Sequence, residues 1–277
     1  TSLKSFNPID IKKKANGMLS IDVYREMYYV AKEAPQDTII LEIGTAHGAG
    51  TISLAHGALN KNKVVSIDKI TGGSRDKFGT LEENKSIINN NFKFFGVEKI
   101  INFYVGTSTE IAPKLTEKLK LSVLVIDADG AIDRDFELFY NKLLPGSTVI
   151  IDDYSNYVRI KKDKKNIRID QKFKLTHMLV SFFEKANLLE KKKVIDNTYF
   201  GIKPKNQKEN VDFSRYDFRP IYRYLTFASN KSPSLVSNIK SNIIEQISQF
   251  TLRMSPNLYH KCRRIYKKLK KLTKKTY

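Results

Sequence analysis

The sequence lacks the features that would place it in a membrane or in an oxidising compartment. No apolar run in its 277 residues approaches the roughly eighteen that a membrane-spanning helix needs. The first twenty residues contain no apolar stretch typical of a signal peptide. Cys262 is the one cysteine, which excludes an internal disulfide. With 41% hydrophobic residues, we expect a globular, cytoplasmic protein with one large α/β domain or two small ones.

Acidic residues are scarce relative to basic ones, and the imbalance is uneven along the chain. The sequence has 49 Lys and Arg against 29 Asp and Glu, a net charge of +20. Residues 205–277 hold 17 of the basic and 4 of the acidic residues, and so account for +13 of that charge. A basic balance is typical of proteins that meet nucleic acid, an anionic membrane surface or an acidic substrate. The question of a charged partner therefore concerns mainly the last quarter of the chain.

Apolar runs alternate with amphipathic segments over the first three quarters of the chain. We expect strands at 37–43, 63–68, 99–106, 121–127 and 147–152, helices at 19–33, 51–60, 80–96, 108–119, 133–143 and 170–188, and an edge hairpin at 192–203. Fully apolar strands alternating with helices predict a parallel sheet covered on both faces. The expected fold is a doubly wound, Rossmann-like α/β domain over 15–204. A basic, mostly helical extension follows over 205–277, irregular to 234 and then helical at 235–253 and 257–274.

The stretch LEIGTAHGAG, at 41–50, has the pattern Glu42-x-Gly44-x-x-x-Gly48-x-Gly50. A strand that leads through glycines into a helix is suited to binding a nucleotide, because the backbone and the helix N-terminus can approach the ligand. Asp68 ends the next strand, where such folds place an acid on ribose hydroxyls. The glycines could instead form only a tight turn, but the acids and the strand-helix alternation favour a cofactor site.

Aspartates end two further apolar runs, VLVIDADG at 123–130 and TVIIDDY at 148–154. We expect Asp127, Asp129, Asp152 and Asp153 at the carboxyl ends of adjacent strands, where open sheets bind ligands. Carboxylates that meet there repel one another, and a hard cation such as Mg²⁺ would compensate for the repulsion. The alternative is that these aspartates are solvated strand caps.

The glycine-loop spacing resembles the first motif of class I S-adenosylmethionine-dependent methyltransferases. The resemblance implies that the loop surrounds the methionine part of the cofactor and that GTSTE, at 106–110, contacts the adenine. The residues expected against S-adenosylmethionine are Glu42, Gly44, Gly48, Gly50, Asp68, Thr107, Ser108 and Asp127.

A narrower resemblance rests on IDADG, LLPGSTVIIDDY and SIDKITGG. These segments look like the divalent-metal-dependent O-methyltransferases of the macrocin and novobiocin type, which methylate sugar hydroxyls. The resemblance implies Mg²⁺ held by Asp127, Asp152 and Asp153, with Asp129 as general base. Catechol methyltransferases of this fold use a lysine three residues after the first metal aspartate, where this chain has Gly130. A sugar or similar polyhydroxylated acceptor therefore ranks above a catechol.

Two basic stretches indicate a charged binding partner without specifying which one. RIKKDKKNIRIDQKFK, at 159–174, either attracts an anionic acceptor or is a solvated loop. The helix at 257–274 could lie on an anionic membrane, pair with a second copy or form a solubilising face, and nucleic acid ranks lower because no recognition motif accompanies the charge. The alternatives to a sugar methyltransferase are a catechol-type or RNA methyltransferase and a non-catalytic binding protein that docks through its basic tail.

Overall fold

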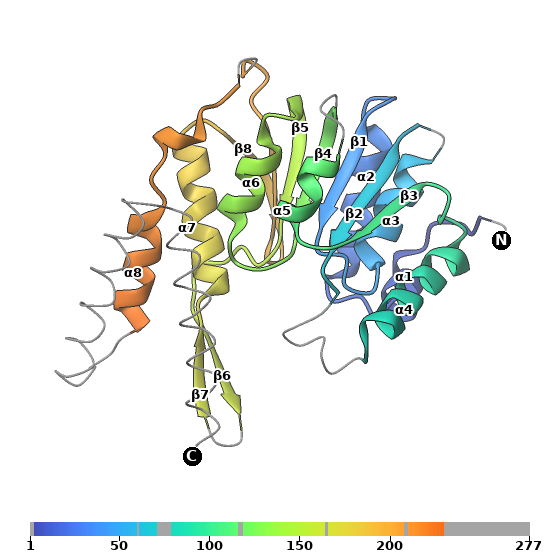
Figure 1. Ribbon diagram of the computed structural model, residues 1–277, viewed down its shortest axis with the longest axis horizontal. Helices are drawn as coiled ribbons and strands as arrows, with labels where there is room; N and C mark the ends of the chain where they lie inside the picture. Colours follow the sequence, from blue (N-terminus) through green and yellow to red (C-terminus); the bar gives the residue numbers. More distant parts are fainter. Residues whose placement is uncertain are drawn as a thin grey trace. The chain divides into compact units, whose positions relative to one another are not determined.

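A seven-stranded sheet forms the centre of the unit that ends at Leu225 (Figure 1). The structure is a computed structural model that describes residues 3–59, 61–70, 79–115, 119–163, 166–207 and 210–229. The strand order is β3-β2-β1-β4-β5-β9-β8. The parallel strands are β1 (Ile39–Ile43), β2 (Lys63–Asp68), β3 (Ile101–Val105), β4 (Leu121–Ile126) and β5 (Leu143–Ile151). The predicted doubly wound sheet is confirmed.

The predicted edge hairpin is also confirmed. It consists of β8 (Glu190–Ile195) and β9 (Thr198–Ile202), and β9 pairs antiparallel with both β5 and β8.

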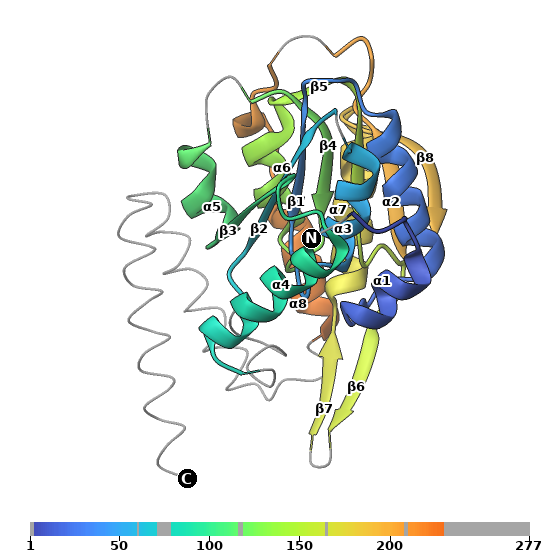
Figure 2. The same ribbon diagram turned by 90° about the vertical axis from the view of Figure 1, so that its right-hand side faces the viewer.

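Helices cover both faces of the sheet (Figure 2). One face packs against α1 (Pro8–Lys14), α2 (Ile21–Glu33), α3 (Ala49–Ala58) and α4 (Leu81–Phe95). The other packs against α5 (Ser108–Ile111), α6 (Ile132–Tyr140) and α7 (Lys172–Lys185). Side chains of a strand point alternately to the two faces, so Ile40 and Leu41 enter different cores. This two-sided burial explains why the strands are apolar throughout.

Capping residues account for the helix ends that the sequence predicts well. Ser20 caps α2, and its hydroxyl accepts a hydrogen bond from the Val23 N–H at 3.3 Å. Thr80 and Glu83 form a capping box at the start of α4, and Gly96 ends that helix with a left-handed φ of 72°. The helix predicted at 108–119 is shorter than expected. Pro113 cannot continue α5, and a 3₁₀ turn, η2 (Ala112–Lys114), follows instead.

The basic segment after β5 forms regular structure rather than a loop. β6 (Arg159–Asp163) and β7 (Asn166–Asp170) pair as an antiparallel ribbon that projects away from the sheet and leads back into α7 (Figures 1 and 2). The two ends of this ribbon therefore lie beside each other, next to the start of α7.

The compact unit that contains the sheet extends to Leu225, beyond the predicted boundary at 204. Within 205–225 lie a 3₁₀ turn, η3 (Phe213–Arg215), and most of α8 (Arg219–Ser229), where irregular structure was expected. Phe213 is buried, with its ring centroid 5.6 Å from that of Tyr140. The helices expected at 235–253 and 257–274 lie outside the described residues.

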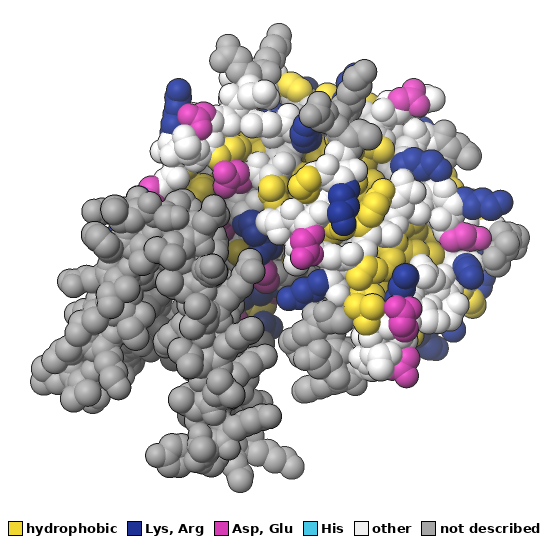
Figure 3. All heavy atoms as spheres, viewed as in Figure 1, with side chains coloured by type: hydrophobic (Ala, Val, Ile, Leu, Met, Phe, Trp, Pro, Cys, Tyr) yellow, Lys and Arg dark blue, Asp and Glu magenta, His cyan; other side chains and the backbone are white. Residues whose placement is uncertain are grey.

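The described surface carries charge of both signs. On the face shown in Figure 3, Lys and Arg side chains are scattered among acidic and hydrophobic ones. Within the part of the chain that the structure describes, no helix is long and apolar enough to cross a bilayer.

Phe213 tests whether the segment after 204 is part of the domain. Phe213→Ala should lower the free energy of unfolding by about 3 kcal/mol, because it empties a buried aromatic site. Tyr224→Ala is the control, since Tyr224 is 55% exposed and its loss should cost about 0.5 kcal/mol or less. Urea unfolding measures both. A loss in Phe213→Ala as small as that in Tyr224→Ala would show that the segment does not stabilise the domain.

Candidate active site

A cavity of about 1090 Å³ opens at the carboxyl ends of the parallel strands. Residues at or just after the ends of all five parallel strands line it, namely Gly44, Asp68, Gly106, Asp127 and Asp152. The strand order reverses between β1 and β4, which is where doubly wound sheets bind their ligands.

Gly44 stands where the glycine loop meets the end of β4. Its φ is +103°, and a Cβ atom at this position would lie only 1.9 Å from the carbonyl oxygen of Asp127. The backbone is held there by two hydrogen bonds, from the Gly44 N–H to Ile67 O at 2.9 Å and from the Asp127 N–H to Ile43 O at 2.8 Å. Only glycine satisfies both the conformation and the contact.

The other two glycines of the motif serve the packing of the loop. Gly48 is the N-cap of α3 with φ +93°, and a Cβ there would lie 2.7 Å from the Phe92 ring. A Cβ at Gly50 would lie 2.4 Å from Glu42 Oε1. Neither glycine lines the large cavity. Of the three glycines expected against the cofactor, the structure places Gly44 at that cavity.

Glu42 lies beneath the glycine loop. It is buried, its Oε2 accepts hydrogen bonds from the Thr51 and Ser66 hydroxyls, and it lines a small cavity of about 20 Å³ beside the large one. Burial raises the pKa of Glu42 to about 7, although the two hydroxyls lower it. The structure therefore places Glu42 as a support of the loop, outside the lining of the large cavity.

Asp68 holds the loop and also faces the large cavity. Its Oδ2 accepts the backbone N–H groups of Thr45 at 2.7 Å and Ala46 at 3.0 Å, and its Oδ1 accepts that of Ile70 at 2.7 Å. The side chain that was expected on the ribose thus also joins the ends of β1 and β2.

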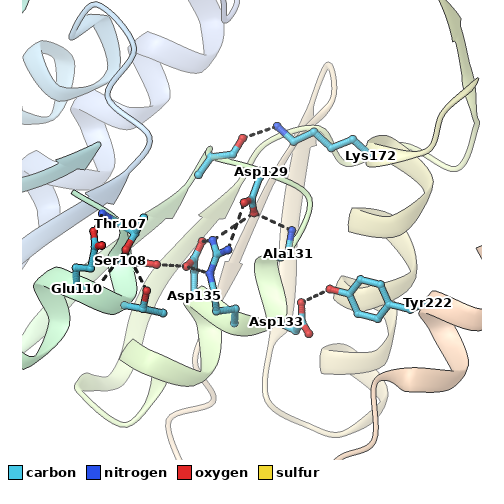
Figure 4. A network of polar contacts seen from close by, with 12 residues as sticks. Thr107, Ser108, Glu110, Asp129, Ala131, Asp133, Asp135, Lys172 and Tyr222 are labelled. Atoms are coloured by element: carbon cyan, nitrogen blue, oxygen red, sulfur yellow. Dashed lines mark hydrogen bonds and ion pairs between the residues drawn. The ribbon is translucent and has the colours of Figure 1, made fainter. Parts of the chain in front are cut away.

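Thr107 and Ser108, expected at the adenine, both line the cavity. The Thr107 hydroxyl caps α5 and accepts the Glu110 N–H at 3.3 Å. The Ser108 hydroxyl donates to Asp135, which also pairs with Arg134 at 2.9 Å (Figure 4). Both hydroxyls are therefore engaged by the protein itself.

The carboxylates after β4 and β5 have different partners. Asp127 is half-buried. Asp152 Oδ1 accepts the Thr198 hydroxyl at 2.7 Å. Asp153 has a left-handed φ of 58°, and its Oδ2 lies 2.6 Å from Lys172 Nζ. Asp127 and Asp152 thus share one end of the cavity, while Asp153 is turned toward α7.

The electrostatics reflect this crowding. Desolvation and the charge of Asp152 hold the pKa of Asp127 well above its ordinary value, and the cation of Lys172 only partly opposes them. Desolvation and the charge of Asp153 likewise raise the pKa of Asp152. Desolvation lowers the pKa of Lys172, but its carboxylate neighbours, Asp153 first, outweigh this and raise it overall. Lys172 is therefore an ammonium ion at neutral pH.

The carboxylates as placed do not fit a bound Mg²⁺. Their oxygens are the right donors for a hard cation. Among the residues that the structure describes, however, no three His, Cys, Asp or Glu side chains are grouped so that they could hold a metal ion. The cation that contacts Asp153 is the ammonium of Lys172. The three predicted ligands are neighbours without forming a common coordination site.

Asp129, the expected general base, is paired with Arg134 (Figure 4). Arg134 donates to both carboxylate oxygens at 3.2 Å, and the Ala131 N–H donates to Oδ1 at 3.0 Å. Desolvation raises the pKa of Asp129, but Arg134 outweighs it and the pKa is lowered. Asp129 lines the cavity and is 58% exposed, so it stands at the rim as a weak proton acceptor.

Sequence reasoning missed several residues that line the cavity, among them Lys172, Arg134, Thr198, Tyr157, Phe173 and Met18. Lys172 belongs to the basic segment 159–174, for which attraction of an anionic acceptor was one of two interpretations, so the charge pattern carried part of the signal. Thr198 is the first residue of β9, and no local pattern marks it.

The comparisons with known proteins agree with this geometry. Residues 41–154 match the family described as "Methyltransferase domain". Similar solved structures include an O-methyltransferase from Bacillus cereus in complex with SAH (16% identity, TM-score 0.51, covering 71% of this chain and 89% of that one). The SAH-bound methyltransferase PaMTH1 from Podospora anserina has 12% identity and a TM-score of 0.52, covering 72% and 88%.

The O-methyltransferase NovP has 16% identity and a TM-score of 0.51, covering 72% of this chain and 89% of its own. No curated protein matches the chain in sequence. The chain is therefore similar to methyltransferase domains over residues 41–154, and the solved structures share its fold.

Gly44 offers a direct test of the loop geometry. Gly44→Ala should abolish binding of S-adenosylhomocysteine in calorimetry, because the added methyl group forces the loop away from β4. Gly146→Ala is the matched control. It has a similar φ of +82°, but a Cβ there meets only the Lys205 side chain at 3.5 Å. Equal affinity of the two variants would contradict the role assigned to Gly44.

Because the pKa of Glu42 is raised in the fold, we expect the free energy of unfolding to fall as the pH rises. Its pKa is about 7 in the fold against 4.5 ordinarily, so its contribution is complete below about pH 4.5 and is lost as the pH rises through about 7. This difference corresponds to about 3 kcal/mol. In urea unfolding at a series of pH values, the wild type should lose that much relative to Glu42→Gln, whose amide does not titrate. Parallel stability profiles would refute the assignment.

Proposed function

We propose that the protein is an S-adenosylmethionine-dependent O-methyltransferase that acts on a hydroxyl of a sugar or similar polyhydroxylated acceptor. The observation that carries the proposal is the shared cavity. Gly44, Asp68 and Thr107, expected at the methyl donor, line the same space as Asp127 and Asp152, expected at the acceptor. Its volume of about 1090 Å³ reaches the upper end of small-molecule sites, about 300–1,000 Å³, and so leaves room for both reactants.

The charge of the lining supports a cationic donor. The described lining residues include seven aspartates and five Lys or Arg, an acidic excess that favours a sulfonium group. The same excess gives no support to the anionic acceptor considered from the basic segment. We therefore propose a neutral, hydroxylated acceptor.

The outer part of the cavity offers a surface for a ring. Tyr157 and Phe173 lie with their ring centroids 5.2 Å apart, and the Arg159 guanidinium lies 4.3 Å from the centroid of Phe173. Aromatic faces pack against the C–H groups of a sugar, while Asn197 in the β8–β9 turn and Thr198 at the start of β9 supply polar groups to the same cavity.

Bound S-adenosylmethionine supplies an activated methyl group on a sulfonium centre, and its transfer leaves a thioether. The acceptor oxygen attacks the methyl carbon in line, the carbon–sulfur bond breaks, and the hydroxyl proton passes to a carboxylate. Because Asp127 lies against Gly44 of the donor loop, we assign the proton to Asp127. Asp129, the base expected from the sequence, is held at the rim by Arg134.

Magnesium dependence stays a prediction of the sequence, and no step proposed here uses it. The alternatives are a catechol or RNA acceptor and a non-catalytic binding role. Transfer of a labelled methyl group from S-adenosylmethionine should be measured against glycosides and nucleotide-linked sugars, catechols and RNA. The proposal expects transfer to the sugars. Transfer to RNA that survives Asp152→Ala would contradict it, and absence of cofactor binding would favour the binding protein.

The two aspartates of IDADG separate the candidate bases. Asp127→Asn should lower the rate of transfer at least about a hundredfold, which is typical for removal of a general base, with cofactor affinity within about threefold. Asp129→Asn, the matched control two residues away, should cost less than about tenfold. A larger loss in Asp129→Asn would return the base role to Asp129, and equal loss of affinity and rate in Asp127→Asn would indicate a structural residue.

A further inference from the structure

Lys172 reaches the carboxylates from the start of α7. Its Nζ donates to Asp153 Oδ2 at 2.6 Å and to the carbonyl oxygen of Ala128 at 2.9 Å. Its side chain is 25% exposed and lines the large cavity. One cation thus connects the segments that follow β4 and β5.

The place of Lys172 in α7 is unfavourable for the helix itself. Helix N-termini favour acidic residues, but the first turn of α7 contains Lys172 and Lys174 and no acidic residue. A residue that breaks a local preference in this way needs a compensating contact elsewhere, and here the compensation is the carboxylate cluster.

Gly130 leaves room for the lysine stem. A Cβ atom at position 130 would lie 3.4 Å from Lys172 Cγ and 3.2 Å from Leu175 Cδ2, tighter than most real contacts. The glycine that ends IDADG therefore lets the start of α7 approach the end of β4.

The other cations of the cavity have partners of their own. Arg134 pairs with Asp129 and Asp135, and Arg159 pairs with Asp170 at 2.8 Å. Lys12 donates to the carbonyl oxygen of Leu19 at 2.6 Å. Lys172 differs from these three cations in that it contacts Asp153.

We propose that the Lys172 ammonium is the resident cation of the acceptor site, neutralising the carboxylates where a divalent metal ion was expected. This inference rests on the proposed function and adds that methyl transfer proceeds without a metal ion. An ammonium has three N–H donors, and the contacts above use two. Because Lys172 lines the cavity, the third is left for the acceptor, where it donates to an oxygen of the bound polyol beside Asp127 and Asp152.

The test is a titration of the full-length protein with Mn²⁺, followed by electron paramagnetic resonance, with and without saturating S-adenosylhomocysteine. Wild type should bind Mn²⁺ only weakly. Lys172→Gln removes the charge but keeps a donor for Ala128 O, and should bind Mn²⁺ at least about tenfold more tightly, because a nearby positive charge no longer repels the ion. Lys172→Arg, which keeps the charge, should behave as wild type.

Lys174→Gln is the matched control. It removes the same charge two residues further along α7, where the lysine side chain donates a hydrogen bond to Asn156. It should leave Mn²⁺ affinity unchanged. A stoichiometric Mn²⁺ site in wild type that is lost in Asp127→Asn would overturn the proposal, whether or not Lys172→Gln folds. Binding of S-adenosylhomocysteine is read in the same experiment, so a failure of the proposed function is seen separately from a failure of this inference.

Discussion

The contact between Gly44 and the backbone of Asp127 is the constraint on which the site depends. It joins the end of β1 to the end of β4 at the point where the strand order reverses. Because no side chain separates the two backbones, the loop expected to hold the methyl donor lies directly beside the first carboxylate of the acceptor region. The common cavity follows from this approach, and so does the assignment of proton transfer to Asp127.

Acidic residues at the strand ends differ in role because their surroundings differ. Glu42 is buried under hydroxyl donors, Asp68 binds three backbone N–H groups, and Asp129 is held by an arginine. Asp127 and Asp152 are the crowded pair, and Asp153 is neutralised by Lys172. An acidic side chain thus supports the loop, holds neighbouring strands or faces the reactants, according to its partner and its burial.

The sheet was predictable because its signals are local. Apolar strands, the Ser20 and Thr80 caps and the Gly96 stop are each set within a few residues, and the structure confirms them. The position of the cavity, with the glycine loop on one side and the aspartates after β4 and β5 on the other, was also predictable. The rule that ligands bind at the carboxyl ends of parallel strands needs only the strand order.

Side-chain pairing was not predictable in the same way. Lys172 contacts Asp153, 19 positions earlier in the sequence, and Thr198 contacts Asp152, 46 positions earlier. The residues next to the aspartates in the sequence do not indicate either partner. The same holds for Phe213, whose burial against Tyr140 extends the domain past 204. Asp129 was expected to be a free base because its sequence position matched, while the arginine that holds it comes from the next helix.

The most direct measurement is a crystal structure of the protein with S-adenosylhomocysteine. The account predicts the ligand in the cavity at the strand ends, with its ribose hydroxyls toward Asp68 and its sulfur on the side of the cavity lined by Gly44 and Asp127. A ligand bound elsewhere, or one whose sulfur faces away from Asp127, would contradict the proposal that donor and acceptor meet in this cavity.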